Sequence, residues 1–323
     1  MDSNPLPTTN SADVEPSNPT NVRIYVVQRC PRLLDLENGV QTAIEEIATA
    51  AKAGANLIAF PETWLIGYPA WVFGMASWND PEARKWYRKL VEASPTTSSS
   101  HISRIRDAAR ENNIEVILGF NERAREAGGT VYNSVALIGR DGSLRGVHRK
   151  LTPTHAERLV WANGDARDLK AYKTDSGRIG AAVCWEHFHP LIRQALHDED
   201  EQIHVALWPD MPDAHQIASR NYAFEGRCFV VVAASYLDAD SIPSELLEAY
   251  VKGAGSKDLF TGGSSVIGPD GEYIAGPVYG PEPLVVDIDL GQTIAFKHDL
   301  DVAGHYSRPD IFQLLVNREG SRR

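Results

Sequence analysis

The sequence contains few cysteines, no long apolar run and no excess of basic residues. Three cysteines among 323 residues cannot form the disulfide framework of a small secreted protein, so we expect reduced thiols and a cytoplasmic location. No apolar stretch approaches the roughly 18 residues that cross a membrane. The formal net charge of −11 is the wrong sign for a nucleic-acid or anionic-membrane partner, because both require a basic surface. These absences favour a globular protein with neither partner.

The chain is expected to consist of one large domain between two tails. Residues 1–21 are rich in Pro, Asn, Ser and Thr and have no apolar signal core, which is typical of a disordered segment. Residues 22–312 are predicted to form a single domain, and residues 313–323 a C-terminal tail.

Within that domain, apolar strands alternate with amphipathic helices. Helices are indicated where apolar residues recur at helical spacing, and strands where short apolar runs end at Gly, Pro or polar residues. A less regular, aromatic-rich segment is expected from residue 64 to about residue 86. The predicted strands cover residues 22–28, 56–60, 114–120, 178–185, 203–208 and 228–235, the helices 34–54, 101–113, 190–201 and 214–226, and the hairpins 134–148 and 264–276.

Two pairs of segments indicate an internal duplication. "NLIAFPE" (56–62) resembles "HVALWPD" (204–210), and "VALIGRDGSLRG" (135–146) resembles "SVIGPDGEYIAG" (265–276). Because both pairs occur in the same order, we predict two βαβ-type halves. Together they would form an α/β fold of two mixed sheets packed face to face, with helices outside.

Three reactive side chains follow predicted strands. Glu62 and Lys150 come after a strand and a hairpin, and Cys184 lies near the end of another strand. Active sites of open α/β sheets lie at the carboxyl ends of strands, and a thiol nucleophile needs a base and a nearby cation. Taken singly, each residue also has a structural interpretation: a buried apolar Cys, a helix-capping Glu and a surface Lys.

The segments around these residues resemble the Glu-Lys-Cys motifs of the nitrilase superfamily. They are "FPET", "HRKLTPTHAER" and "VCWEH", and "GYPAW", "CWEHFHPL" and "GHYSRPDIF" extend the likeness from about Val22 to Phe312. A cysteine followed by Trp-Glu is similar to the nitrilase branch. The resemblance implies an αββα sandwich and a hydrolase that forms dimers or larger spirals. The chain departs from the family in two places. "LVWANGD" lacks one glycine that is expected soon after its tryptophan, and the tail after Arg308 is short, which disfavours long filaments.

The resemblance also implies catalytic roles. Cys184 would attack a nitrile carbon to form a thioimidate, and Glu62 would act as the general base. Lys150 would hold the thiolate and stabilise the tetrahedral centre, with the backbone N–H of Trp185 as a second donor. No cofactor is implied. No metal is expected either, because the ten histidines include no pairing with carboxylates at the helical spacing of a zinc site.

Four further residues are candidates for the same site. Glu157 is expected to orient the lysine and the substrate, and a helix-start carboxylate paired with Arg158 is the alternative. Tyr68 and Trp185 are predicted to line an apolar substrate pocket, although aromatic residues there could equally belong to the core or to a subunit interface. His187 lies either at the pocket rim or in the core as a hydrogen-bonded histidine. "CWEH" resembles nitrilases that act on arylacetonitriles, so an aromatic or arylaliphatic nitrile is expected.

The predicted function is therefore hydrolysis of a small-molecule nitrile to a carboxylic acid and ammonia by a homo-oligomeric enzyme. The alternatives are an amidase, a carbamoylase or a cyanide-degrading enzyme on the same scaffold, and a scaffold without catalytic activity. The presence of Glu62, Lys150 and Cys184 together argues against the inactive scaffold.

Overall fold

The computed structural model describes residues 20–255 and 259–319. Residues 1–19 of the predicted N-terminal tail therefore lie outside the described residues. Strand β1 (Asn21–Val26) begins one residue before the predicted start of the domain. Among the described residues, none of the helices combines the length and the apolar character needed to cross a membrane.

Strands and helices alternate along the chain, as the apolar patterns predict. The remaining strands are β2 (Leu57–Ala59), β3 (Glu115–Arg123), β4 (Val131–Ile138), β5 (Leu144–Arg149), β6 (Tyr172–Thr174), β7 (Gly177–Val183), β8 (Ile203–Trp208), β9 (Phe229–Ala234), β10 (Tyr236–Leu237), β11 (Phe260–Ile267), β12 (Tyr273–Tyr279) and β13 (Leu284–Asp289). The helices are α1 (Leu36–Lys52), α2 (Pro81–Ala93), α3 (Ser100–Glu111), α4 (Pro190–His197), α5 (Asp213–Gly226), α6 (Ser244–Ala254) and α7 (Gly291–Phe296).

The two halves of the chain form two sheets of similar topology. Within the described residues, one sheet has the order β13-β1-β2-β3-β4-β5, and the other has the order β10-β11-β9-β8-β7-β6 with β12 paired to β11. In the first sheet β1, β2 and β3 are parallel, and β4 and β5 follow as antiparallel strands. In the second sheet β7, β8 and β9 are parallel, and β11 and β12 follow in the same antiparallel manner. The two mixed sheets predicted from the duplicated segments are thus confirmed.

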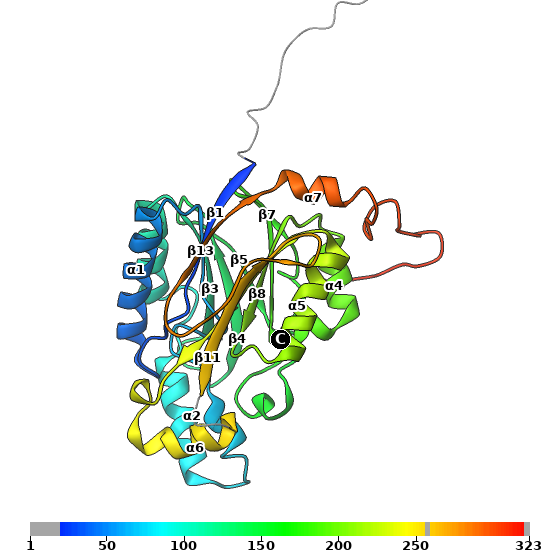
Figure 1. The fold of residues 1–323 in the computed structure, drawn as a ribbon. Coiled ribbons are helices and arrows are strands. Elements are labelled where there is room, and N and C mark those ends of the chain that lie inside the picture. The colour runs from blue at the N-terminus through cyan, green and yellow to red at the C-terminus, as the bar shows by residue number, and fades with distance from the viewer. Residues whose placement is uncertain (1–19, 256–258, 320–323) are drawn as a thin grey trace, which may run out of the picture.

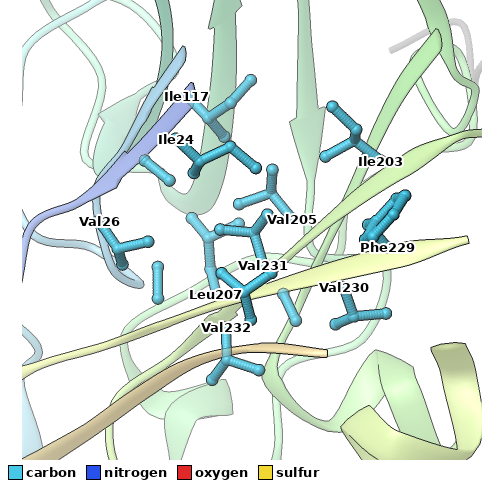
Figure 2. Close-up of a cluster of buried hydrophobic side chains, with 14 of the residues drawn as sticks. Ile24, Val26, Ile117, Ile203, Val205, Leu207, Phe229, Val230, Val231 and Val232 are labelled. Carbon is cyan, nitrogen blue, oxygen red and sulfur yellow. The ribbon is translucent and has the colours of Figure 1, made fainter. Parts of the chain in front are cut away.

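The sheets pack face to face, and helices cover their outer faces (Figure 1). Helix α1 lies on one side of the molecule, and α4 and α5 lie on the other. Figure 2 shows the apolar interface between the sheets, where Ile24 and Ile117 of the first sheet lie near Val205 and Val231 of the second. A separate cluster of buried apolar residues joins the first sheet to α1 and α3. This arrangement confirms the αββα sandwich.

Helices α2 and α6 were not expected from the sequence. Helix α2 begins inside the segment predicted to be irregular, with Pro81 at its first position and the Asp80 carboxylate accepting hydrogen bonds from two backbone N–H groups of the first turn. Helix α6 packs against a 3-10 turn at Ala70–Phe73. Both helices lie at the same end of the molecule (Figure 1). Gly253 and Ala254 at the end of α6 line the cavity at the candidate site.

The residues after α7 return along the surface near α4 (Figure 1). Arg318 donates hydrogen bonds to the Leu169 carbonyl (3.2 Å) and to Glu199 (2.6 Å). Leu314 and Val316 pack against the small apolar cluster around α4. The described part of the predicted C-terminal tail therefore contacts the domain, and the division of the chain at residues 21 and 312 stays a prediction.

Candidate active site

Cys184 is the first residue of a 3-10 turn (Cys184–Phe188) that directly follows β7. Its φ angle of 53° lies in the left-handed region, which non-glycine residues adopt only where the surrounding structure holds them there. Glu186 fixes the turn, because its carboxylate accepts hydrogen bonds from the N–H groups of Val183 (2.8 Å) and Leu151 (2.9 Å). The turn thereby connects the residue before the thiol with the residue after Lys150.

Four predicted catalytic residues meet at this turn. The Cys184 sulfur and one carboxylate oxygen each from Glu62 and Glu157 lie within 4.8 Å of one another. Lys150 Nζ donates to Glu157 Oε2 at 2.8 Å and to Glu62 Oε1 at 3.4 Å. All four side chains are buried, with Cys184 the most exposed at 4 %. The structure thus brings these residues together, and their catalytic roles stay predictions.

Two further side chains hold the carboxylates in place. Asn133 of β4 donates its Nδ2 to Glu62 Oε1 at 2.6 Å. Tyr68 donates its hydroxyl to Glu157 Oε1 at 2.6 Å, and the N–H of Thr154 donates to the other oxygen at 2.6 Å. Sequence reasoning missed Asn133, whose signal is a polar amide side chain in a largely apolar, buried strand.

One oxygen of the Glu62 carboxylate remains available for proton transfer. Glu62 Oε2 is buried and has no hydrogen-bond partner among the described residues. Its partner oxygen is occupied by Asn133 and Lys150. A buried carboxylate oxygen without a donor is an energetically unfavourable arrangement that a thiol proton would relieve.

Burial and charge set the protonation of the site. Burial raises the pKa of Glu62 to about 7, and the nearby Lys150 ammonium limits the rise. Burial, together with the charge of Glu62, raises the pKa of the Cys184 thiol well above its usual value, against the opposing effect of Lys150. Burial alone would lower the pKa of Lys150, but the acidic groups around it, Cys184, Glu62 and Glu157, raise it. The thiol at rest is therefore neutral beside the Lys150 ammonium, and the pKa of Glu62 lies near neutral pH.

The spacing of Glu62, Glu157 and Cys184 would also suit a metal ion. However, Lys150 Nζ already donates to both carboxylates, so the buried positive charge comes from the chain itself. An added cation would have to approach this ammonium at close range in a region of low polarity, where like charges repel strongly. The donor set fits an ammonium better than a metal ion.

The thiol opens into a cavity of about 710 Å³, a volume typical of small-molecule sites. Tyr68, Cys184 and Trp185 line this cavity, whereas Glu62 and Lys150 are buried behind the lining residues. The structure thus places both Tyr68 and Trp185 at the predicted pocket. The lining also includes the aromatic and imidazole side chains of Phe73, His155, His189, His215 and Phe260.

His187 lies behind the Cys184 turn and does not line this cavity. Only 1 % of its surface is exposed, and its Nδ1 lies 2.7 Å from the Cys184 carbonyl oxygen. Its other ring nitrogen lies 2.9 Å from His204 Nε2. The substrate-binding role predicted for His187 does not fit this position, because the turn directs the ring into the core. The alternative, a hydrogen-bonded histidine, describes it correctly.

Comparison with known proteins identifies the family. The carbon-nitrogen hydrolase model matches residues 23–298, and the chain belongs to this family. It is 36% identical over 313 residues to a nitrilase of Pseudomonas syringae, covering 92% of this chain and 90% of the relative. It is 35% identical over 326 residues to an aliphatic nitrilase of Rhodococcus rhodochrous (92% and 79% covered). An arylacetonitrilase of Aspergillus kawachii is 34% identical over 318 residues (94% and 93% covered).

Solved structures show the same fold. A carbon-nitrogen hydrolase of Helicobacter pylori superimposes with a TM-score of 0.71 at 18% identity, covering 91% of this chain and 98% of that one. The C. elegans NitFhit protein gives a TM-score of 0.71 at 19% identity, covering 93% of this chain and 68% of that one.

Proposed function

We propose that this protein is a nitrilase, which hydrolyses an organic nitrile to a carboxylic acid and ammonia. The observation that carries this proposal is the approach of the Cys184 sulfur to two carboxylates and an ammonium at the wall of a cavity. The relatives named nitrilases, which align with more than nine-tenths of the chain, support the choice of nitrile as substrate.

In the first step, the Cys184 sulfur attacks the nitrile carbon. Glu62 takes the thiol proton on its free oxygen and passes it to the nitrile nitrogen, so a C–S bond forms, one C–N π bond breaks and a thioimidate results. The Lys150 ammonium and the backbone N–H of Trp185 stabilise the negative charge that develops on the sulfur and on the nitrogen.

In the second stage, two water molecules are consumed. Glu62 removes a proton from the first water, which adds to the thioimidate carbon, and ammonia leaves once its nitrogen is protonated. The resulting thioester is cleaved by the second water to give the carboxylic acid and the free Cys184 thiol. Glu157 keeps Lys150 in position throughout, because it accepts from Nζ at 2.8 Å and is itself held by Tyr68.

The lining of the cavity favours an aromatic or arylaliphatic nitrile. Tyr68, Phe73, Trp185 and Phe260 supply flat apolar surfaces around the thiol. Trp185 is 54 % exposed in the free protein, and an aromatic substrate would cover part of that surface.

Mass spectrometry tests the covalent mechanism. The protein is incubated with phenylacetonitrile, quenched in acid and digested, and we expect a thioimidate or acyl adduct on the peptide that contains Cys184. An adduct on Cys30 or Cys228 instead would refute the assignment of the nucleophile. A parallel assay with phenylacetamide separates the activities: ammonia from the nitrile but none from the amide supports a nitrilase, and the reverse supports an amidase.

A homo-oligomer in a reducing compartment is part of the same proposal. Leu191 of α4 and Ile217 and Phe224 of α5 are exposed apolar side chains on the outer helices, which supports association with further copies. All three cysteines are free thiols, as a cytoplasmic location requires. Light scattering during size-exclusion chromatography is expected to give a mass of at least two chains of 35.5 kDa.

A further inference from the structure

A row of buried polar side chains leads from Glu201 to the backbone of Cys184. Glu201 Oε2 lies 3.0 Å from His204 Nδ1, and His204 Nε2 lies 2.9 Å from His187 Nε2. His187 Nδ1 completes the row at 2.7 Å from the Cys184 carbonyl oxygen. At most 2 % of the surface of any of the three side chains is exposed, and none lines the cavity. The proposed reaction assigns them no role.

The last contact determines where the protons of this row lie. A carbonyl oxygen can only accept, so His187 Nδ1 must carry a proton and donate it to Cys184. Burial and the neighbouring His204 lower the pKa of His187 to about 3, so the ring is neutral and its Nε2 is an acceptor. His204 Nε2 must therefore be the donor in the contact between the two rings.

The contact between His204 and Glu201 also contains one proton, which can lie on either residue. Either His204 also carries a proton on Nδ1 and pairs as an imidazolium with the carboxylate, or Glu201 is protonated and donates to that nitrogen. Burial alone would raise the pKa of Glu201, but the nearby His204 and the hydrogen bonds from His197 and His204 lower it to about 2, which favours an ionised Glu201. In both cases the pair holds one proton, and the two contacts nearer the thiol, from His204 to His187 and from His187 to the Cys184 carbonyl, donate toward Cys184.

Gly180, Tyr222 and Trp208 pack closely against this row. A Cβ atom on Gly180 would lie 2.1 Å from Glu201 Oε2, so only glycine leaves room for the carboxylate at that position of β7. The Tyr222 hydroxyl donates to the other oxygen of Glu201, and its ring stacks on His204 at a centroid distance of 3.8 Å. Trp208 stacks on His187 at 4.8 Å.

We propose that Glu201, His204 and His187 are positioning residues, which hold the backbone of Cys184 in the left-handed conformation that directs its thiol toward Glu62. The Glu186 carboxylate accepts a hydrogen bond from the N–H of Val183, the residue before the thiol. His187 donates to the carbonyl of Cys184 itself. Because φ at Cys184 is 53°, loss of this hydrogen bond would let the turn relax and displace the sulfur.

The test compares two substitutions at one position. His187→Asn retains a donor where Nδ1 lies, whereas His187→Leu keeps similar bulk without a donor. Two quantities are measured: the alkylation rate of Cys184 by iodoacetamide, followed by peptide mass spectrometry, and the kcat and KM for phenylacetonitrile. We expect His187→Leu to lower both the alkylation rate and kcat by about tenfold or more, with KM nearly unchanged, and His187→Asn to recover most of each loss.

A control separates positioning from loss of stability. Val230→Ala creates a cavity in β9 beside His204, its register partner, without altering a hydrogen bond of the row. We expect Val230→Ala to lower the melting temperature but to leave the alkylation rate and kcat near wild type. Near-wild-type values for His187→Leu, or equal losses in His187→Leu and His187→Asn, would refute the proposal.

Proton positions give a second, independent readout. Nitrogen-15 NMR of histidine-labelled protein is expected to show a neutral imidazole, protonated at Nδ1, whose signal disappears in His187→Asn. A His187 ring protonated only at Nε2 would refute the hydrogen-bond direction. The proposal rests on the proposed role of Cys184, but alkylation and NMR need no nitrile. If the wild-type protein hydrolysed no nitrile, the nitrilase assignment would fail while the positioning row remained testable.

Discussion

The two halves of the molecule share a strand plan but contribute different chemistry to the site. In both, three parallel strands are followed by an antiparallel hairpin: β1, β2, β3 with β4 and β5, and β7, β8, β9 with β11 and β12. The segments that resemble each other in sequence, 56–62 and 204–210, overlap the matching strands β2 and β8. The two halves therefore share the arrangement of their strands but differ in their side chains.

The acid after each matching strand shows this divergence. Glu62 follows β2, is fully buried and contacts Lys150. Its counterpart Asp210 follows β8, has a side chain 45% exposed and lies 3.6 Å from His215 at the cavity wall. The difference in burial raises the pKa of Glu62 to about 7, whereas the Asp210 carboxylate is partly exposed at the cavity wall.

The residue after the first parallel strand differs in the same way. Val26 pairs with Ala59 of β2, and Val183 pairs with Leu207 of β8. Since these partners correspond in the duplicated segments, the next residues, Val27 and Cys184, also correspond. One half thus supplies the acid and the ammonium and the other supplies the thiol, so neither half alone would form the site.

The largest expected effect comes from removing the thiol. Cys184→Ala gives the second half an apolar residue at this position, as in the first half, and we expect nitrile hydrolysis to fall by at least about 10⁴-fold because no nucleophile remains. Ammonia release measures the loss, and the melting temperature should stay near that of the wild type. Cys228→Ala, at a buried cysteine outside the site, is the matched control and should retain activity. Activity near wild type in Cys184→Ala would end the covalent mechanism.

The two corresponding acids should respond differently to the same change. Glu62→Gln removes the general base while keeping the size of the side chain, so kcat should fall by about 10²–10⁴-fold. Asp210→Asn is the matched substitution in the other half. We expect it to alter mainly KM, by less than about tenfold, because Asp210 lies at the cavity wall beside His215 and not in the network of Glu62, Lys150 and Glu157. Steady-state kinetics on phenylacetonitrile distinguish the two, and equal losses of kcat would contradict the proposed division of roles.

The pH dependence of kcat/KM should report the buried acid. Glu62 accepts the thiol proton only as a carboxylate, and its pKa is raised to about 7, so activity should increase as the pH rises through about 7. At pH 5 it should be about 100-fold below its plateau, whereas a base with the ordinary pKa of a glutamate would lose little. Asp210→Asn should leave this acid limb unchanged. An acid limb below pH 5 in the wild-type protein would show that the pKa of Glu62 is not raised in the folded enzyme.

The smallest effect is expected at Tyr68, whose hydroxyl holds the Glu157 carboxylate in place. Tyr68→Phe removes the donor to Glu157 Oε1 and leaves a buried carboxylate oxygen with one donor fewer. We expect a loss of about 1–3 kcal/mol in the free energy of unfolding and a fall in kcat of about tenfold, measured by urea denaturation and steady-state kinetics. Tyr87→Phe, whose hydroxyl bonds the Gly129 carbonyl at the surface, is the control and should change neither quantity appreciably.

Most of the secondary structure could be predicted because its causes are local. Helix α1 ends before Gly54, whose φ is 78°, and β8 coincides with the apolar run "IHVALW". Helix α2 was missed although Asp80 and Pro81 are ordinary signals of a helix start, because its first turn lies in a segment rich in aromatic residues. The duplicated segments predicted the two sheets, since matching sequences adopt matching strands.

By itself, the sequence determined the strand and helix pattern, the internal duplication and the three motifs that contain Glu62, Lys150 and Cys184. Only the tertiary structure decided that an ammonium and a carboxylate 88 residues apart meet beside the thiol, that Tyr68 supports Glu157, and that His187 faces the core. Backbone hydrogen bonds and apolar periodicity depend on residues close in the chain. The direction of a side chain after a strand depends instead on sheet register and on packing between distant elements.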